Sequence, residues 1–252
     1  MPCENLGCTQ INFPNFPFLP YIYNCMQKYA IIVAGGAGTR MGGEIPKQFM
    51  LLKVKPILWH TLHAFIEAYD DMQIVLVLPE AHFETGQAIA KEFPFNRVRT
   101  TIGGATRFHS VKNGLMLVDT HSIVFVHDAV RCLVTPKLIR RCCEITIEKG
   151  NAVPALAITD TIRIETEAGN EAFNRKIVRI IQTPQTFFSN VIKEAYGVNF
   201  DESFTDEAGV VEKMGVKINL VEGERTNIKI TTPIDLLYAE KILEVRGLST
   251  EV

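Results

Sequence analysis

The sequence predicts an α/β domain in which helices flank a mostly parallel, twisted sheet. From about residue 29 to residue 158, short apolar runs typical of buried strands alternate with longer stretches typical of helices. The 252-residue chain is 47% hydrophobic, enough to bury one full core, so we expect a single domain over 26–252. The alternation breaks once, at about 160–181, where the pattern indicates a hairpin arm.

The elements follow one another in a regular order. Strands are expected at 29–33, 73–78, 98–102, 122–126 and 152–158, and helices at 56–69, 81–93, 110–118 and 136–149. Pro56 is typical of a helix start and Gly150 of a helix end. After the arm, helices are expected at 190–196, 206–214 and 233–246, and strands at 216–221 and 227–230.

The arm is expected to consist of two strands, 161–166 and 175–181, in which polar and apolar residues alternate. The turn between them, at 167–171, contains Gly169 followed by Asn170. A lone two-stranded hairpin is marginally stable in water. We therefore expect the arm to pack on the partner subunit of a homodimer.

Composition excludes several classes of function. A net charge of -2 gives no general attraction to nucleic acid, and no run after residue 25 approaches the roughly 18 apolar residues that cross a membrane. The six cysteines form no C-x-x-C pair or zinc spacing, which indicates reduced thiols and a cytoplasmic protein. Residues 1–25 contain four prolines and no basic start, so we expect a non-structural extension or, alternatively, an arm that packs on a neighbour.

A glycine-rich loop after the first expected strand is the strongest functional signal. The loop has the sequence Ala34-Gly35-Gly36-Ala37-Gly38-Thr39-Arg40-Met41 and is followed by Pro46-Lys47-Gln48. Glycines let backbone N–H groups approach an anion, while Arg40 and Lys47 would neutralise charge that develops on phosphorus. The loop predicts a phosphate site at the end of a strand, where open α/β sheets bind ligands.

The spacing excludes two familiar phosphate loops. A P-loop requires Ser or Thr after its lysine, but Gln48 follows Lys47. A dinucleotide loop requires a third glycine where Met41 stands, and Pro46 disfavours a helix that runs straight on from the loop. The remaining pattern is similar to the signature of nucleotidyltransferases that join a nucleoside triphosphate to a sugar or polyol phosphate.

Four further clusters are expected at loops where such a sheet places its site. They are Gly103-Gly104-Ala105-Thr106-Arg107 with Ser110, His127-Asp128-Ala129-Val130-Arg131, Thr205-Asp206-Glu207-Ala208, and Asn227-Ile228-Lys229. Each also has a purely structural interpretation: a turn at Gly103 and Gly104, a surface ion pair between Asp128 and Arg131, a helix cap at Thr205, and an edge charge at Lys229.

Together these motifs resemble one family in order and spacing, from Met26 to about Val245. The family is 2-C-methyl-D-erythritol 4-phosphate cytidylyltransferase, of the non-mevalonate isoprenoid pathway. The Asp160-Thr161 and Thr183-Pro184-Gln185 motifs also fit it. The resemblance implies a Rossmann-like fold and a homodimer whose protruding hairpin arm reaches into the partner's active site.

The resemblance also implies roles for single residues. Those that would bind CTP are Ala34, Gly35, Gly36, Gly38, Gly104, Ala105, Ser110 and Asp128. Arg40, Lys47 and Lys229 would contact the phosphates as catalytic cations. The polyol phosphate would be held by Arg131 and Thr205, together with Thr161 and Arg175 from the partner subunit.

The implied chemistry needs no general base, because the methylerythritol phosphate already carries a nucleophilic oxygen anion. Cations must bring two polyanions together and stabilise the crowded α-phosphorus. No metal-ligand cluster is visible in the sequence, so Mg²⁺ is expected to be held mainly by phosphates and water.

Three alternatives stay open. A ribitol 5-phosphate cytidylyltransferase of the same superfamily would share the nucleotide site and differ in the polyol pocket. An NAD(P)-dependent dehydrogenase would use the glycine loop for a dinucleotide. A non-enzymatic nucleotide-binding module would bind CTP but release no pyrophosphate.

Overall fold

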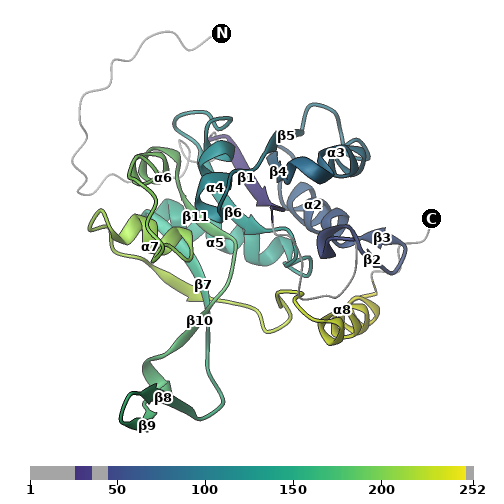
Figure 1. The fold of residues 1–252 in the computed structure, drawn as a ribbon. Coiled ribbons are helices and arrows are strands. Elements are labelled where there is room, and N and C mark those ends of the chain that lie inside the picture. The colour runs from purple at the N-terminus through teal and green to yellow at the C-terminus, as the bar shows by residue number, and fades with distance from the viewer. Residues whose placement is uncertain (1–25, 36–44, 248–252) are drawn as a thin grey trace, which may run out of the picture.

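The computed structural model describes residues 26–35 and 45–247, and its central feature is a twisted sheet with helices on both faces (Figure 1). Hydrogen-bonded neighbours follow the order β10-β7-β11-β6-β1-β4-β5, and β12 also pairs with β7. The bounds are β1 Lys28–Val33, β4 Gln73–Leu78, β5 Val98–Ile102, β6 Ile123–Asp128, β7 Asn151–Ala157, β10 Arg179–Ile181, β11 Gln185–Phe188 and β12 Leu220–Glu222. The expected extension at 1–25 and the site residues Gly36, Gly38 and Arg40 lie outside the described residues.

The prediction of a mostly parallel sheet is confirmed. β1 pairs in parallel with β4 and β6, and β4 with β5, while β12 runs parallel to β7. β11 is antiparallel to both β6 and β7, and β10 is antiparallel to β7. The carboxyl ends of β1, β4, β5 and β6 therefore meet at one edge, which is where ligand loops are expected in this type of sheet.

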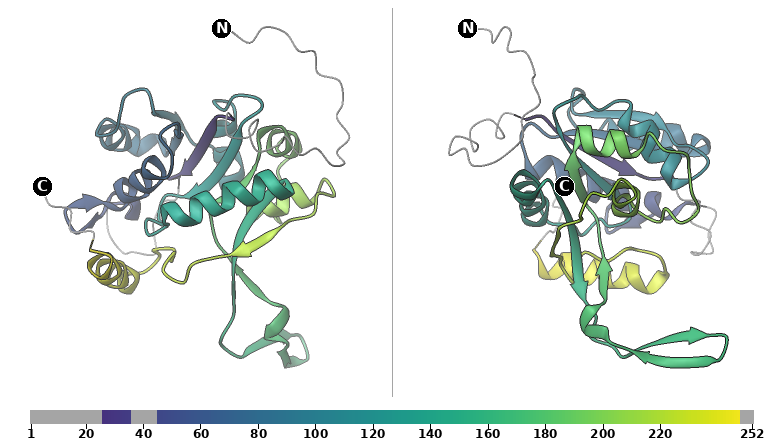
Figure 2. Two further views of the ribbon diagram at one scale, coloured as in Figure 1. Left: turned by 180° about the vertical axis from the view of Figure 1, so that it is seen from behind. Right: turned by 90° about the vertical axis from the view of Figure 1, so that its left-hand side faces the viewer.

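Helices cover both faces of the sheet (Figures 1 and 2). Their bounds are α2 Ile57–Ala68, α3 Phe83–Ala90, α4 Arg107–Leu115, α5 Pro136–Lys149, α6 Ser189–Ala195, α7 Glu207–Glu212 and α8 Pro233–Val245. The boundaries of α5 follow local chemistry: the Thr135 hydroxyl accepts a bond from the Leu138 N–H at 3.1 Å, and Gly150 ends the helix with φ 94°. Within the described part of the chain, no helix is long and apolar enough to span a membrane.

A hydrophobic core forms on each face of the sheet because successive strand residues point to opposite faces. On one face, Ile32 belongs to a buried cluster with Phe65 of α2 and Leu138 of α5. On the other, Ile31 belongs to a cluster with Phe108 of α4 and Ile192 of α6. β1 and β6 contribute to both clusters, which explains why these strands are apolar without alternation.

Several elements differ in their bounds from those expected from the sequence, because tertiary contacts and caps determine where they begin and end. α4 begins at Arg107, three residues before the expected start, because Thr106 caps it and accepts a bond from the His109 N–H at 3.4 Å. The strand expected at 216–221 is limited to β12, and 227–230 forms no strand. Asn227 and Ile230 in that segment are fully buried. Instead of pairing with a strand, the segment makes isolated contacts such as the 3.0 Å hydrogen bond from the Ile230 N–H to the Val130 carbonyl. Its buried residues therefore give a sequence pattern similar to that of a strand.

The arm projects from the sheet, as Figure 2 shows, but its expected second strand is wrong. The hairpin pairs β8 Ile162–Thr166 with β9 Gly169–Phe173 around a two-residue turn. β9 begins at Gly169, whose φ is 128°. A positive φ of this kind favours glycine. The segment expected at 175–181 instead forms a 3₁₀ turn, Arg175–Ile177, and then β10, which joins the main sheet through β7.

Candidate active site

Two loops meet at the carboxyl edge of the sheet, one after β1 and one after β5. Gly103 follows β5, and a side chain on it would place its Cβ 2.9 Å from the Ser110 hydroxyl, too close for any residue but glycine. A Cβ on Gly104 would lie 2.4 Å from the His109 Cβ, and one on Gly35 would lie 3.4 Å from Ser110. Close packing of three backbone segments explains why this edge is rich in glycine.

The Ser110 side chain holds the second loop in place. Its hydroxyl accepts a bond from the Gly104 N–H at 3.1 Å and lies 3.0 Å from the Thr106 carbonyl, to which it donates. Ser110 is buried, whereas Gly104 and Ala105 are exposed. The expected base-binding residues are thus together, with Gly104 and Ala105 facing solvent and Ser110 supporting them from below.

The Pro46-Lys47-Gln48 motif is fixed to the first loop. Gln48 is 1% exposed, and its amide donates to the Ala34 carbonyl at 2.7 Å. The Ala34 N–H in turn donates to the Val77 carbonyl of β4 at 2.9 Å. Lys47 begins a 3₁₀ turn, Lys47–Phe49, so this anchor holds the turn that carries Lys47 to the end of β1.

Asp128, the last residue of β6, is the centre of a cluster of charges. Its Oδ1 lies 3.3 Å from Arg107 Nη2, and its Oδ2 lies 3.0 Å from Lys229 Nζ and 3.4 Å from Arg131 Nε. Burial would raise the pKa of the Asp128 carboxyl, but Arg107, Lys229 and Arg131 outweigh burial and hold that pKa well below its usual range. Asp128 therefore stays ionised, and the surface ion pair is the wrong interpretation because Asp128 is only 7% exposed.

A buried network supports the loop after Asp128. His127 is fully buried, and its Nε2 lies 3.2 Å from the Arg131 carbonyl, which can only accept, so Nε2 carries the proton. The Thr183 hydroxyl then donates to His127 Nδ1 at 2.9 Å and accepts from the Asp128 N–H at 3.2 Å. Burial is the main reason that the pKa of His127 falls to about 3, so the ring is neutral.

The α7 motif is built differently from the expected cap. Asp206, not Thr205, is the N-cap, because its side chain accepts from the Gly209 N–H at 2.9 Å. Gln185 fixes this end from β11: its amide donates to Asp206 at 2.8 Å, and its amide oxygen accepts from the Ala208 N–H at 2.8 Å. Thr205 is exposed and free of the capping role, which leaves it available as a ligand contact.

Thr161 and Arg175 lie on the arm, apart from the sheet edge that carries Asp128 (Figure 2). Thr161 directly precedes β8, and Arg175 begins the 3₁₀ turn after β9, where its guanidinium donates to the Thr159 carbonyl. Both residues are exposed. The structure thus brings together the described residues expected on the sheet and leaves the two arm residues separate.

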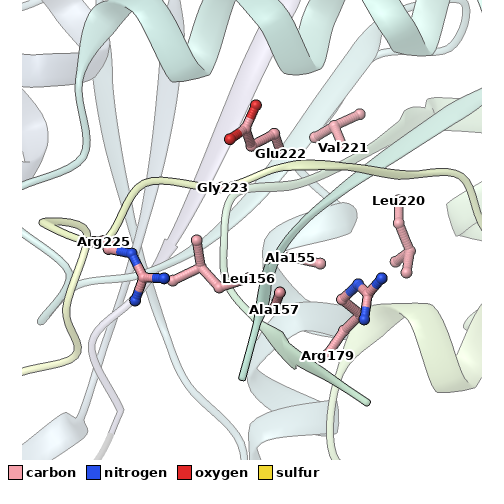
Figure 3. Close-up of a pocket in the computed structure, with 9 residues that line it drawn as sticks. All are labelled: Ala155, Leu156, Ala157, Arg179, Leu220, Val221, Glu222, Gly223 and Arg225. Carbon is pink, nitrogen blue, oxygen red and sulfur yellow. The ribbon is translucent and has the colours of Figure 1, made fainter. Parts of the chain in front are cut away.

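A pocket of about 580 Å³ lies at the base of the arm (Figure 3). It is lined by Ala155, Leu156, Ala157, Arg179, Leu220, Val221, Glu222, Gly223 and Arg225, from β7, β10, β12 and the segment after β12. None of these residues belongs to the cluster around Asp128. The pocket marks the edge of the sheet beside the arm and is separate from the glycine loops.

Two charged residues that contact the site were not assigned a role from the sequence. These residues are Arg107 and Glu207, and each falls within a motif that the sequence displays. Arg107 forms ion pairs with Asp128 and with the fully buried Glu207. Their ion pair joins positions 100 residues apart. The Arg in the Gly-Gly-x-x-Arg motif was the available signal, but its partner depends on how α7 packs.

Comparison with known proteins shows the family of this chain. A sequence model of the 2-C-methyl-D-erythritol 4-phosphate cytidylyltransferase family matches residues 28–245. The chain belongs to this family. Among cytidylyltransferases of this name, that of Bacteroides thetaiotaomicron is 47% identical over 220 residues, covering 86% of this chain and 100% of the relative. That of Porphyromonas gingivalis (strain W83) is 42% identical over 219 residues, covering 86% and 98%.

Solved structures of cytidylyltransferases share the fold. The 4-diphosphocytidyl-2C-methyl-D-erythritol synthase of Anaerococcus prevotii aligns with a TM-score of 0.75 at 27% identity, covering 87% of this chain and 99% of that one. The cytidylyltransferase of Thermus thermophilus aligns with a TM-score of 0.69 at 31% identity, covering 87% and 100%. The family and the α/β fold expected from the motifs are therefore confirmed.

Proposed function

We propose that this chain transfers a cytidylyl group from CTP to 2-C-methyl-D-erythritol 4-phosphate, giving 4-diphosphocytidyl-2-C-methyl-D-erythritol and pyrophosphate. The observation that carries the proposal is the ionised Asp128 among Arg107, Arg131 and Lys229, placed beside the glycine loops in a chain of this family. This arrangement offers one carboxylate for hydroxyl groups and several cations for phosphates, as two joined substrates require.

The nucleotide is proposed to lie over the two glycine loops. Gly35, Gly104 and Ala105 are exposed at this edge, so their backbone groups can recognise the edge of a pyrimidine. Gly36 and Gly38 are also proposed to contact the nucleotide. Asp128 would accept a bond from a ribose hydroxyl.

The reaction is an in-line displacement at the α-phosphorus of CTP. A phosphate oxygen of the polyol phosphate forms the new P–O bond, and the bond to the β-phosphate oxygen breaks, so pyrophosphate leaves with its electron pair. Arg40, Lys47 and Lys229 are proposed to stabilise the charge on the α-phosphate and on the leaving group. Arg131 and Thr205 would position the polyol phosphate.

The described residues include no group of three or more His, Cys, Asp or Glu side chains placed to hold a metal ion. The Asp128 carboxylate is engaged by three cations and is a poor metal ligand in this arrangement. Mg²⁺ is proposed to accompany the triphosphate, where phosphate oxygens and water would hold it. When bound it would supply charge neutralisation to the leaving pyrophosphate.

The arm is proposed to complete the site of a partner subunit. It carries Thr161 and Arg175 on an exposed two-stranded element that is marginal by itself. An isologous dimer would let each arm reach the other subunit and place both residues near the polyol phosphate.

Pyrophosphate release with matched substrates tests this function. With methylerythritol phosphate as acceptor, we expect turnover with CTP and little with ATP or GTP, because a site in which Gly104, Ala105 and Ser110 enclose a pyrimidine would exclude the larger purine. UTP should also be poor, since it exchanges a donor for an acceptor at one ring edge. Faster turnover with ribitol 5-phosphate would assign the chain to the related acceptor, and NAD(P)H binding without pyrophosphate release would contradict the proposal.

A further inference from the structure

We propose that Arg107 and Glu207 are positioning residues for this reaction, acting on Asp128 and on the loop that carries Thr205. The inference rests on the proposed function and adds to it two residues that do not touch substrate. Their ion pair joins the starts of α4 and α7, and Arg107 also contacts Asp128 at the end of β6, so three elements that carry an expected contact are connected.

The contacts of Arg107 are shared between two carboxylates. Its guanidinium binds Glu207 with both terminal nitrogens, with Nη2 at 3.1 Å from Oε2, and the same Nη2 lies 3.3 Å from Asp128 Oδ1. Glu207 is 0% exposed. A buried carboxylate of this kind requires a cation, so Glu207 fixes Arg107 in a single position rather than leaving it free to follow Asp128.

Arg107 thereby divides the two oxygens of Asp128. Oδ1 faces Arg107, whereas Oδ2 faces Lys229 at 3.0 Å and Arg131 at 3.4 Å. Because Arg107 contacts Oδ1, the other oxygen, Oδ2, is directed toward Lys229 and Arg131, the residues assigned to the substrates. Rotation of the Asp128 carboxylate would break both sets of contacts.

The same ion pair connects the nucleotide and polyol sides of the site. Arg107 is the first residue of α4, two positions after Ala105, and Glu207 is the first residue of α7, two positions after Thr205. Aromatic packing runs beside it: the Phe108 ring stacks on Tyr196 at 4.7 Å and on Phe204 at 5.7 Å. Removing the ion pair should therefore release Asp128 and the Thr205 loop together.

Glu207→Gln tests the proposal, since it keeps the shape of the side chain and removes its charge. We expect the Kd for CTP, measured by calorimetry, to rise by at least roughly tenfold, and kcat/KM for the polyol phosphate to fall by a similar factor. Asp71→Asn is the matched control: it removes the partner of Lys28, whose side chain is 6% exposed, at the other end of β1. The control should bind CTP as the wild type does.

Coupling to Asp128 separates positioning from a general loss of stability. If Glu207 acts through Arg107 on Asp128, adding Glu207→Gln to Asp128→Asn should change the Kd for CTP by less than about twofold. A full additional loss, or a single Glu207→Gln variant within twofold of wild type, overturns the proposal. Should Glu207→Gln fail to fold, Arg107→Lys keeps the charge and loses the two-pronged contact, and the same losses are expected from it.

Thermal unfolding tests the bridge without any substrate. Glu207→Gln or Asp128→Asn alone leaves Arg107 one carboxylate partner, and the double variant leaves it no carboxylate partner among the described residues. The Tm of the double variant should thus fall by more than the sum of the single decreases, and strict additivity would show that Arg107 does not bridge the two. Wild-type protein that releases no pyrophosphate would instead refute the proposed function and leave the bridge to be judged by this unfolding result.

Discussion

At the scale of single residues, Asp128 depends on the cations around it. Its neighbours carry three positive charges, and Glu207 adds one further negative charge, so the cluster has one positive charge in excess. An incoming triphosphate would meet this excess at Lys229, whose side chain is 44% exposed, more than that of Arg107 or Arg131. Lys229 is therefore the member of the described cluster best placed to turn toward a phosphate.

Lys229→Ala and Lys47→Ala are each expected to lower kcat by at least ~100-fold, the scale of losing a group that stabilises transition-state charge. Folding should change little, because Asp128 keeps Arg107 and Arg131 in the first variant. Steady-state kinetics and Tm measure the two effects. Lys241→Ala is the control, since that lysine is 75% exposed on α8, and near-normal kcat in either site variant would contradict the assignment.

His127 gives a prediction for stability against pH. The folded protein keeps the ring neutral down to a pKa of about 3, because the ring is buried, while an unfolded chain protonates it near 6.5. Below pH 6.5 the unfolded state thus binds one more proton, and His127 makes stability fall with decreasing pH by up to about 1.4 kcal/mol per pH unit.

Urea unfolding at several pH values between 7 and 4.5 measures this effect against His127→Gln. The variant should be less stable at pH 7, since it disturbs the bonds to Thr183 and Arg131, and its stability should decline less steeply as the pH falls. Equal slopes for the two proteins would show that His127 is not held neutral.

Residue-level prediction succeeded where the chemistry is local. The glycines before α4 and the motif around Asp128 follow from backbone space and strand ends, and both lie at the expected edge. Thr205 and Asp206 are adjacent residues of similar capping ability, so the sequence could not decide between them. The pairing of Arg107 with Glu207 depends on the packing of α4 against α7, which no local pattern records.

At the scale of elements, the arm shows how a correct pattern can give a wrong strand. Alternation at 175–181 was real, but it belongs to a segment that returns to the sheet as β10. The partner of β8 is instead the polar β9, which pairs Glu165 with Asn170. Strand partners depend on the turn position, and Glu167 and Ala168 form the turn two residues earlier than the Gly169-Asn170 pair suggests.

Mixing two inactive variants tests whether the arm acts on a partner. Lys47→Ala damages the site of its own subunit, whereas Arg175→Ala should damage the site that the arm enters. A heterodimer would then hold one site with both changes and one with neither. After subunit exchange of an equal mixture, roughly a quarter of wild-type activity should return, since half the dimers have one of two sites intact.

Two controls make this result specific. A mixture of Lys47→Ala with Lys229→Ala should recover nothing, because each change affects its own subunit's site. Arg163→Ala, on β8 of the same arm, removes contacts to Asn170 only and should stay active. An active monomer in sedimentation, or no recovery despite proven exchange, would refute the shared site.

At the scale of the whole molecule, the fold class followed from the alternation of strands and helices. That alternation persists because each parallel strand needs a crossover, and helices provide it. The sequence does not show that β11 enters the sheet antiparallel between β6 and β7, since strand order is fixed by long-range pairing such as that of Phe187 with Val124 of β6. The expected positions of the glycine loops and of Asp128 do not depend on this strand order, because these residues lie at the ends of β1, β5 and β6.

Cytidylyl transfer requires that the bond between the α- and β-phosphates of CTP breaks. CTP labelled separately at its α- and γ-phosphorus, incubated with methylerythritol phosphate, measures this directly by the position of the label in separated products. For cytidylyl transfer, we expect the α-label to enter the polyol product and one pyrophosphate carrying the γ-label to be released for each transfer. A γ-label on the polyol, or an α-label found only in CMP, would contradict it.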